Sequence, residues 1–137
     1  MDKVEYTESR LENVDNSYQN YHVYRRTLCV CSAGLLRSPT LAWVLSNPPY
    51  NRNTRAAGSH PEYALVQVDS ALLTWAAEIV FVNEENRDET YRLHPHFPVM
   101  SAVYILDLPD QYGYRAPELL AAIYAELKRV GFPKLTR

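Results

Sequence analysis

The feature that most constrains this chain is a short loop at residues 31–38, between a predicted strand and a predicted helix. Residues 27–30 are a run of apolar and β-branched side chains, which predicts a strand. Ser38 suits the N-cap of a helix, Pro39 suits its first position, and good helix formers follow. The stretch therefore predicts strand, tight loop and helix in succession, with the helix starting where the loop ends.

The composition of this loop predicts a phosphate site with a nucleophile at its base. The residues between Cys31 and Arg37 can wrap into a cradle whose backbone N–H groups converge on one point, backed by the positive end of the helix. The same field favours the thiolate form of Cys31, which would make it a nucleophile. Arg37 could hold two phosphate oxygens through its planar guanidinium, and the Ser38 hydroxyl could donate to the sulfur. The candidate phosphate-binding residues are Ser32, Ala33, Gly34, Leu35, Leu36 and Ser38. The competing interpretation is a small buried cysteine and a surface arginine.

The succession strand, Cys-x5-Arg-Ser-Pro and helix resembles the low-molecular-weight protein tyrosine phosphatases and their bacterial and phage relatives. Residues 55–58 resemble the short second strand of that family, which ends in Ala-Gly, and residues 75–82 resemble its third strand. The resemblance covers about residues 23–132, with only the first loop highly specific. It implies a phosphatase that acts on phosphotyrosine or a small aryl phosphate through a phosphocysteine intermediate, without a metal or cofactor.

A later loop, residues 106–112, occupies the position that carries the general acid in this family. Two aspartates compete for the role. Asp110 matches the family's Asp-Pro-Tyr by its spacing to Tyr112, whereas Asp107 matches by lying directly at a strand end. We favour Asp110 and expect the other aspartate to cap or brace the loop. Tyr112 and Tyr114 are candidates for a rim that recognises an aryl phosphate, or else exposed loop aromatics.

The first loop departs from the family pattern at two places. Where relatives have Gly-Asn, this chain has Ala33 and Gly34, so the hydrogen bonds of that asparagine are missing. The second loop cysteine of many relatives is replaced by Leu36, which cannot protect an oxidised Cys31. Cys29 lies two positions upstream on the strand, and we expect it to be buried and unable to take over that protection.

Alternation of strands and helices predicts the fold. The predicted strands cover residues 27–30, 54–58, 79–82 and 102–106, and the predicted helices follow residue 38, span 68–77, follow residue 83 and span 117–130. This order implies a single α/β domain with a four-stranded parallel doubly wound sheet, flavodoxin-like, with helices on both faces. Ligands bind beyond the C-terminal ends of such strands, so the loops at 31–38 and 107–114 should converge on one crevice.

Length and charge set further bounds. The chain has 137 residues, enough for one domain with a substantial core, and its net charge of −2 gives no electrostatic basis for binding nucleic acid or an acidic membrane. No apolar run is long enough to span a membrane, and the first residues do not form a signal peptide. Two cysteines this close on one strand make a poor disulfide. We therefore expect a cytoplasmic protein whose partner is a phosphorylated protein or a small aryl phosphate, and the sequence leaves its oligomeric state open.

The domain itself is expected to span residues 23–137, with residues 1–22 as an N-terminal extension, because that polar segment precedes the point where the family begins. His94 and His96 have a spacing that can bind a metal, but a proline-rich loop is the better interpretation. The acidic run at 83–89 predicts a solvated helix start rather than a metal site.

Two other functions remain possible. Arsenate reduction on this fold needs further cysteines to relay electrons, and only Cys29 is left. A non-catalytic module could hold a phosphate or phosphopeptide in the same cradle.

Overall fold

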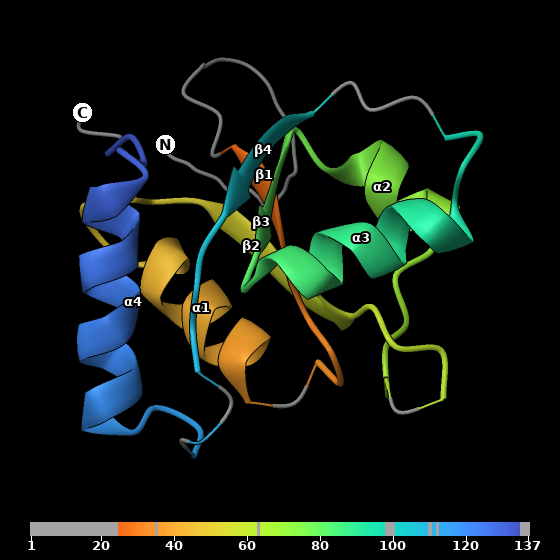
Figure 1. Cartoon of the computed structure of the whole chain (residues 1–137). Helices are drawn as coiled ribbons and strands as arrows, with labels where there is room; N and C mark the ends of the chain where they lie inside the picture. The colour runs from red at the N-terminus through yellow and green to blue at the C-terminus, as the bar shows by residue number, and fades with distance from the viewer. Residues whose placement is uncertain are drawn as a thin grey trace.

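The computed structural model describes residues 25–34, 36–62, 64–97, 101–109, 111 and 113–134. The strands are β1 (Arg26–Cys31), β2 (Asn53–Gly58), β3 (Glu78–Phe81) and β4 (Ala102–Ile105). The helices are α1 (Arg37–Ser46), α2 (Ser70–Trp75), α3 (Glu84–Leu93) and α4 (Pro117–Arg129). All strand pairs are parallel and the sheet order is β2-β1-β3-β4, which confirms the predicted parallel α/β domain (Figure 1).

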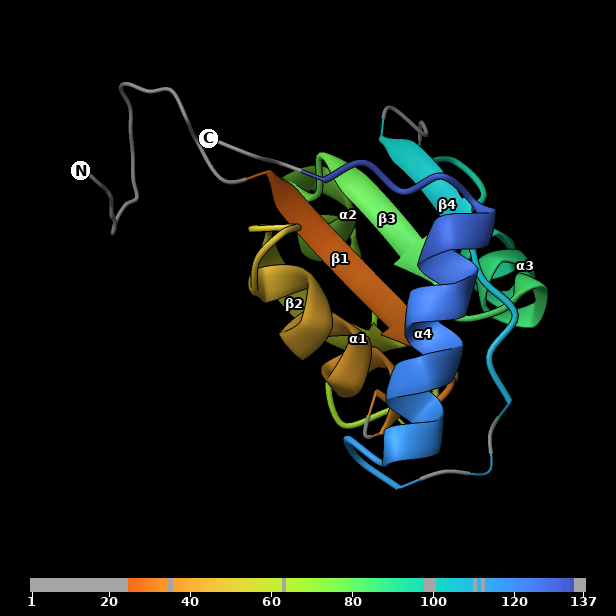
Figure 2. The ribbon, with the colours of Figure 1, turned by 90° about the vertical axis from the view of Figure 1, so that its left-hand side faces the viewer.

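Helices cover both faces of the sheet. Helices α1 and α4 lie together on one face, nearest the viewer in Figure 2, and α2 and α3 lie on the other. The side chains of β1 alternate between these layers, so that Cys29 and Cys31 join the cluster under α1 and α4 while Leu28 and Val30 join the cluster under α2 and α3. A strand buried on both sides has to be apolar throughout, which explains the continuous run in the sequence.

The first helix differs from the prediction at its start. Helix α1 begins at Arg37, so Ser38 lies inside the helix and is not its N-cap. Leu36 occupies the cap position and makes no side-chain cap bond. The prediction was wrong because the Ser38 hydroxyl is not turned back to the helix backbone: it lies 3.1 Å from the sulfur of Cys31.

The connections place the loop after β1 at a topological switch point. From β1 the chain moves to β2 on one side, and after α2 it returns to β3 on the other side of β1. Helices therefore leave β1 and β3 toward opposite faces, and in sheets of this kind ligands bind beyond the carboxyl ends of such strands. Cys31 is the last residue of β1 and lies at this end of the sheet.

A network of buried charges lies at the opposite end of the sheet. The carboxylate of Glu78, only 1% exposed, accepts from Arg52 Nε at 2.6 Å, from Arg25 Nε at 3.1 Å and from the Thr27 hydroxyl at 2.8 Å. The Arg52 guanidinium also stacks over the Phe132 ring at 4.4 Å. This end of the sheet is fixed by ion pairs that no local sequence pattern predicts. Among the described residues, no helix is long and apolar enough to cross a membrane.

Candidate active site

The sulfur of Cys31 lies at the base of the loop and is held by two hydrogen-bonding groups. The backbone N–H of Gly34 donates to Sγ at 3.1 Å, and the Ser38 hydroxyl lies 3.1 Å from the same atom. Cys31 is only 3% exposed. Gly34 has a φ of +75°, a left-handed conformation that favours glycine and that turns its N–H back toward the sulfur. When the sulfur is a thiolate, both groups can donate to it, so the loop is arranged to stabilise negative charge on this atom.

The outer side of the loop is fixed by the segment that follows β2. The N–H groups of Ser59 and His60 donate to the carbonyls of Cys31 and Ser32, at 2.7 and 3.0 Å. A trans peptide carries its N–H opposite its carbonyl, so the N–H groups that follow these two carbonyls point away from β2. A Cβ on Gly58 would lie 2.6 Å from the Ser32 carbonyl oxygen, which shows how closely β2 packs under the loop. The loop backbone therefore turns donors toward its inner side, as an anion site requires.

Arg37 connects the cysteine loop to the segment after β4. Its side chain is 4% exposed, and its Nη1 donates to the carbonyl of Leu108 at 3.1 Å. The second connection comes from Thr40, whose hydroxyl donates to the Leu36 carbonyl at 2.7 Å and accepts the N–H of Arg115 at 3.0 Å. The segment after β4 is thus fixed to α1 at both of its ends, and the two loops converge as the sequence predicts.

Of the two candidate acids, only Asp107 lies among the described residues. The Asp107 side chain is exposed, and its N–H donates at 2.7 Å to Glu126 Oε1 on α4, at the outer edge of the sheet. The pKa of Arg129 on the same helix is raised, chiefly by its hydrogen bonds to Glu126 and to a smaller extent by the charge of Asp107. Asp110 lies outside the described residues, as do Tyr112 and the loop residue Leu35.

Exposed aromatic and apolar side chains lie around this region. Tyr114 is 49% exposed, and the Arg115 guanidinium carbon stands 5.0 Å from its ring centroid and 4.0 Å from that of Trp43. Arg115 has a φ of +57°. Leu36, at the end of the cysteine loop, is 41% exposed. The Arg115 guanidinium is thus held between two aromatic rings.

Two asparagines that the sequence analysis did not single out hold the loops together, Asn83 at the N-cap of α3 and Asn86 in the first turn of that helix. Asn83 Nδ2 donates to the Leu108 carbonyl at 3.4 Å, beside the Arg37 bond. Asn86 Nδ2 donates to the hydroxyls of Ser32 and Ser59, at 3.2 and 3.1 Å. The available signal was position, since Asn83 directly follows a buried strand and Asn86 lies one helical turn later.

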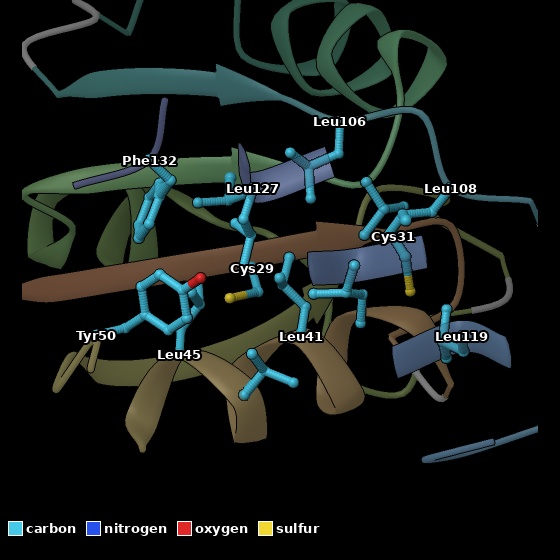
Figure 3. Close-up of a cluster of buried hydrophobic side chains, with 14 residues drawn as sticks. Cys29, Cys31, Leu41, Leu45, Tyr50, Leu106, Leu108, Leu119, Leu127 and Phe132 are labelled. Carbon is cyan, nitrogen blue, oxygen red and sulfur yellow. The ribbon is translucent and has the colours of Figure 1, made fainter. Parts of the chain in front are cut away.

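The second cysteine is part of the core. Cys29 is fully buried, and burial, with a smaller contribution from the charge of Glu78, raises the pKa of its thiol well above the ordinary range. Figure 3 shows Cys29 and Cys31 in the same hydrophobic cluster, with Leu41 and Leu45 of α1 packed beside them. Both cysteines are free. Of the two, only Cys31 has donors placed to stabilise its thiolate.

Elsewhere, the ring of His94 contacts the protein backbone, with Nε2 at 3.3 Å from the Val68 carbonyl oxygen. This contact joins the end of α3 to the segment before α2, away from the cysteine loop.

Solved structures resemble this chain in fold. No protein-family model matches the sequence, and a search of curated proteins finds no relative. Wzb from Vibrio vulnificus, in complex with benzylphosphonate, aligns with a TM-score of 0.59 and 18% identity over 79% of this chain and 94% of Wzb. The arginine phosphatase YwlE from Geobacillus stearothermophilus aligns with a TM-score of 0.56 and 17% identity, over 78% of this chain and 88% of YwlE. The tyrosine phosphatase AmsI from Erwinia amylovora aligns with a TM-score of 0.57 and 17% identity, over 84% of this chain and 93% of AmsI. The chain therefore has the fold of the low-molecular-weight tyrosine phosphatases.

Proposed function

We propose that this protein is a cysteine-dependent phosphatase that hydrolyses phosphotyrosine or a small aryl phosphate. The observation that carries the proposal is the double contact on Cys31, whose sulfur meets the Gly34 N–H and the Ser38 hydroxyl at the N-terminus of α1. A buried cysteine with only a packing role needs no such donors. A nucleophile that is also a leaving group needs them in both steps.

The first step transfers the phosphoryl group to the enzyme. The Cys31 thiolate attacks phosphorus, the S–P bond forms, and the bond from phosphorus to the aryl oxygen breaks. The departing aryl oxide takes a proton from a carboxylic acid. Loop N–H groups and the Arg37 guanidinium hold the equatorial oxygens, on which negative charge is spread in the transition state.

The second step releases inorganic phosphate. Water attacks the phosphocysteine and gives a proton to the carboxylate formed in the first step, and the S–P bond breaks to restore the thiolate. We assign the carboxylic acid to Asp110. Asp107 is the weaker candidate because its backbone lies against α4 and its side chain is exposed at the outer edge of the sheet.

An aryl substrate is favoured by the surroundings of the cradle. Leu36 and Tyr114 offer exposed apolar and aromatic surface at its rim, on which a ring can pack. Wzb holds benzylphosphonate, an aryl-substituted phosphate analogue, and AmsI is a tyrosine phosphatase. YwlE is an arginine phosphatase, so phosphoarginine is the substrate to compare. Because the chemistry needs a reduced thiol, we place the protein in the cytoplasm.

The test is hydrolysis of p-nitrophenyl phosphate between pH 5 and 8, in the presence of a chelator. Wild type should be active, and Cys31→Ser should lose all activity while still binding inorganic phosphate. Cys29→Ser is the matched control, since it changes the same atom in the other cysteine, and it should keep the activity of the folded enzyme. A folded wild-type protein that binds phosphate and hydrolyses no substrate would contradict the proposal and indicate a phosphate-binding module.

A further inference from the structure

We propose that Asn86 is a positioning residue that keeps the cysteine loop in its phosphate-binding shape. This inference rests on the proposed function, because it concerns the same phosphate site. Asn86 is on α3, on the opposite side of the sheet from α1, and it is 2% exposed. It is too deeply buried for contact with a substrate, so it would act through the loop.

The contact geometry uses one nitrogen to join two loops. Nδ2 carries two hydrogens, and it lies 3.2 Å from the Ser32 hydroxyl oxygen and 3.1 Å from that of Ser59. Ser32 is the first residue after the nucleophile. Ser59 follows β2, and its own N–H already donates to the Cys31 carbonyl at 2.7 Å. The Asn86 amide therefore joins the Ser32 side chain to Ser59, and the N–H of Ser59 already holds the backbone of the cysteine loop.

The anchor itself is rigid. The N–H of Asn86 donates to the Asn83 carbonyl at 3.1 Å, in the first turn of α3. Helix α3 directly follows β3, whose register with β1 pairs Phe81 with Val30. The bracing amide is thus carried by the helix that follows the strand adjacent to the one that ends at Cys31.

The oxygen of the Asn86 amide indicates that the residue is present for a functional reason. Asn86 Oδ1 is buried and has no hydrogen-bond partner among the described residues. An unpaired buried acceptor costs about 1–3 kcal/mol. The presence of an amide at this position is explained by its Nδ2 group, whose two hydrogen bonds hold Ser32 and Ser59.

Between Cys31 and Arg37 the loop has no side-chain amide of its own. The family resemblance places an asparagine where this chain has Gly34, and glycine has no side chain to bond across the loop. Asn86 supplies a side-chain amide from outside the loop instead. Loss of that amide should let the Ser32 peptide rotate and misdirect its N–H, which weakens binding of phosphate and of the transition state together.

The experiment compares two isosteric substitutions one helical turn apart, Asn86→Leu and Thr90→Val. Both remove a buried polar group from α3, but only Asn86 contacts the cysteine loop. Binding of inorganic phosphate is measured by calorimetry, and kcat and KM are measured with p-nitrophenyl phosphate. For Asn86→Leu we expect the phosphate Kd to rise at least about tenfold and kcat/KM to fall at least as much. Thr90→Val should lower the melting temperature while leaving the phosphate Kd of the folded protein unchanged.

Ser59→Ala provides a second variant in case Asn86→Leu does not fold. It removes one of the two acceptors and should weaken phosphate binding by a smaller factor, with no further loss when combined with Asn86→Leu. Equal phosphate affinity in wild type, Asn86→Leu and Ser59→Ala would overturn the inference. So would a loss of phosphate affinity in Thr90→Val as large as the loss in Asn86→Leu. If wild type binds phosphate but hydrolyses no substrate, the proposed function is wrong, while the comparison of phosphate Kd values remains valid. If wild type binds no phosphate, the inference is wrong as well.

Discussion

Arg37 Nη1 lies 3.1 Å from the carbonyl oxygen of Leu108, which places the arginine of the cysteine loop against the segment that follows β4. Asn83 donates to the same carbonyl at 3.4 Å. One backbone oxygen thus joins the end of the cysteine loop, the start of α3 and the segment that follows β4. The proposed nucleophile and the proposed acid come from elements far apart in sequence, and the residues that support them both contact this oxygen.

Arg37→Lys should lower kcat/KM for p-nitrophenyl phosphate by at least about 100-fold, because an ammonium cannot hold two phosphate oxygens with the fixed geometry of a guanidinium. It also cannot keep the bond to Leu108 in the same pose. Steady-state kinetics measure the loss. Arg92→Lys, on the exposed face of α3 in a pair with Glu89, is the control and should retain wild-type kinetics. Activity of Arg37→Lys within threefold of wild type would contradict the assigned role.

Asp110→Asn should reduce the hydrolysis of phenyl phosphate far more than that of p-nitrophenyl phosphate. Phenolate is a poor leaving group that needs a proton, and a general acid contributes about 10²–10⁴-fold, whereas p-nitrophenolate leaves readily without one. Asp107→Asn should change both rates by no more than about twofold, since that carboxylate is exposed at the sheet edge. A reversed pattern in the two rate ratios would assign the acid to Asp107.

Gly34→Asn, which restores the residue of the resembled family, should weaken phosphate binding. A Cβ at this position would lie 3.0 Å from the Ala57 carbonyl carbon and 3.0 Å from the Gly58 nitrogen, so β2 would have to shift. Such overpacking costs about 1–3 kcal/mol. Calorimetric phosphate titration and thermal unfolding would measure both effects. Gly113→Ala is the control because its added Cβ meets nothing within 4 Å. Improved phosphate binding in Gly34→Asn would show that the missing amide belongs inside the loop.

Glu78→Gln should destabilise the fold by about 3–5 kcal/mol, because the Arg52 charge would remain buried without its carboxylate. Urea unfolding at pH 7 measures the change. The phosphate Kd of the folded variant should equal that of wild type, since the network lies at the opposite end of the sheet from Cys31. Glu89→Gln, which breaks an exposed pair on α3, should cost no more than about 1 kcal/mol. A small effect of Glu78→Gln would mean that the buried pair is nearly neutral in stability.

Glu126→Gln should destabilise the protein at pH 7 by no more than about 1 kcal/mol, and this difference should shrink in acid. The hydrogen bond from Arg129 holds the pKa of Glu126 below its ordinary value. A carboxylate with a lowered pKa stabilises the fold above its unfolded pKa, and the contribution is lost as the pH falls through the folded pKa. Urea midpoints of wild type and variant at pH 7 and pH 3 would measure this convergence. A gap that widens at low pH would contradict the sign.

The strands were predictable from the sequence to within about a residue, because runs such as Ile79–Val82 must be apolar on both faces of a covered parallel sheet. The cysteine loop was equally accessible, since its spacing and its strand-to-helix position are local. The start of α1 was misplaced because the Ser38 hydroxyl has two possible partners, the helix backbone and the Cys31 sulfur. The Cys31 sulfur comes within hydrogen-bonding distance of the Ser38 hydroxyl only in the folded chain, so the local sequence does not show which partner the hydroxyl takes.

The supports of the site were not predictable in the same way. Asn86 stands in a run of charged residues of which Glu84, Glu85 and Asp88 are exposed, so the run indicates a solvated helix start. Its partners Ser32 and Ser59 are distant in sequence and meet it only through the β2-β1-β3 order. The partners of Glu78 are hidden for the same reason. Patterns of hydrophobicity place elements, but they carry no information about which polar side chains meet between them.

The buried position of Cys29 has a consequence for how such an enzyme would behave under oxidation. Its raised pKa keeps it as an unreactive thiol, and the chain has no third cysteine. A sulfenic acid formed on Cys31 by peroxide would therefore find no neighbouring thiolate to convert it into a reducible disulfide, and further peroxide would carry it to the irreversible sulfinic acid. Molecules that reach the sulfinic acid could be replaced only by newly synthesised protein, so the rate of gene expression, rather than the supply of cellular reductant, would set how soon their activity returns.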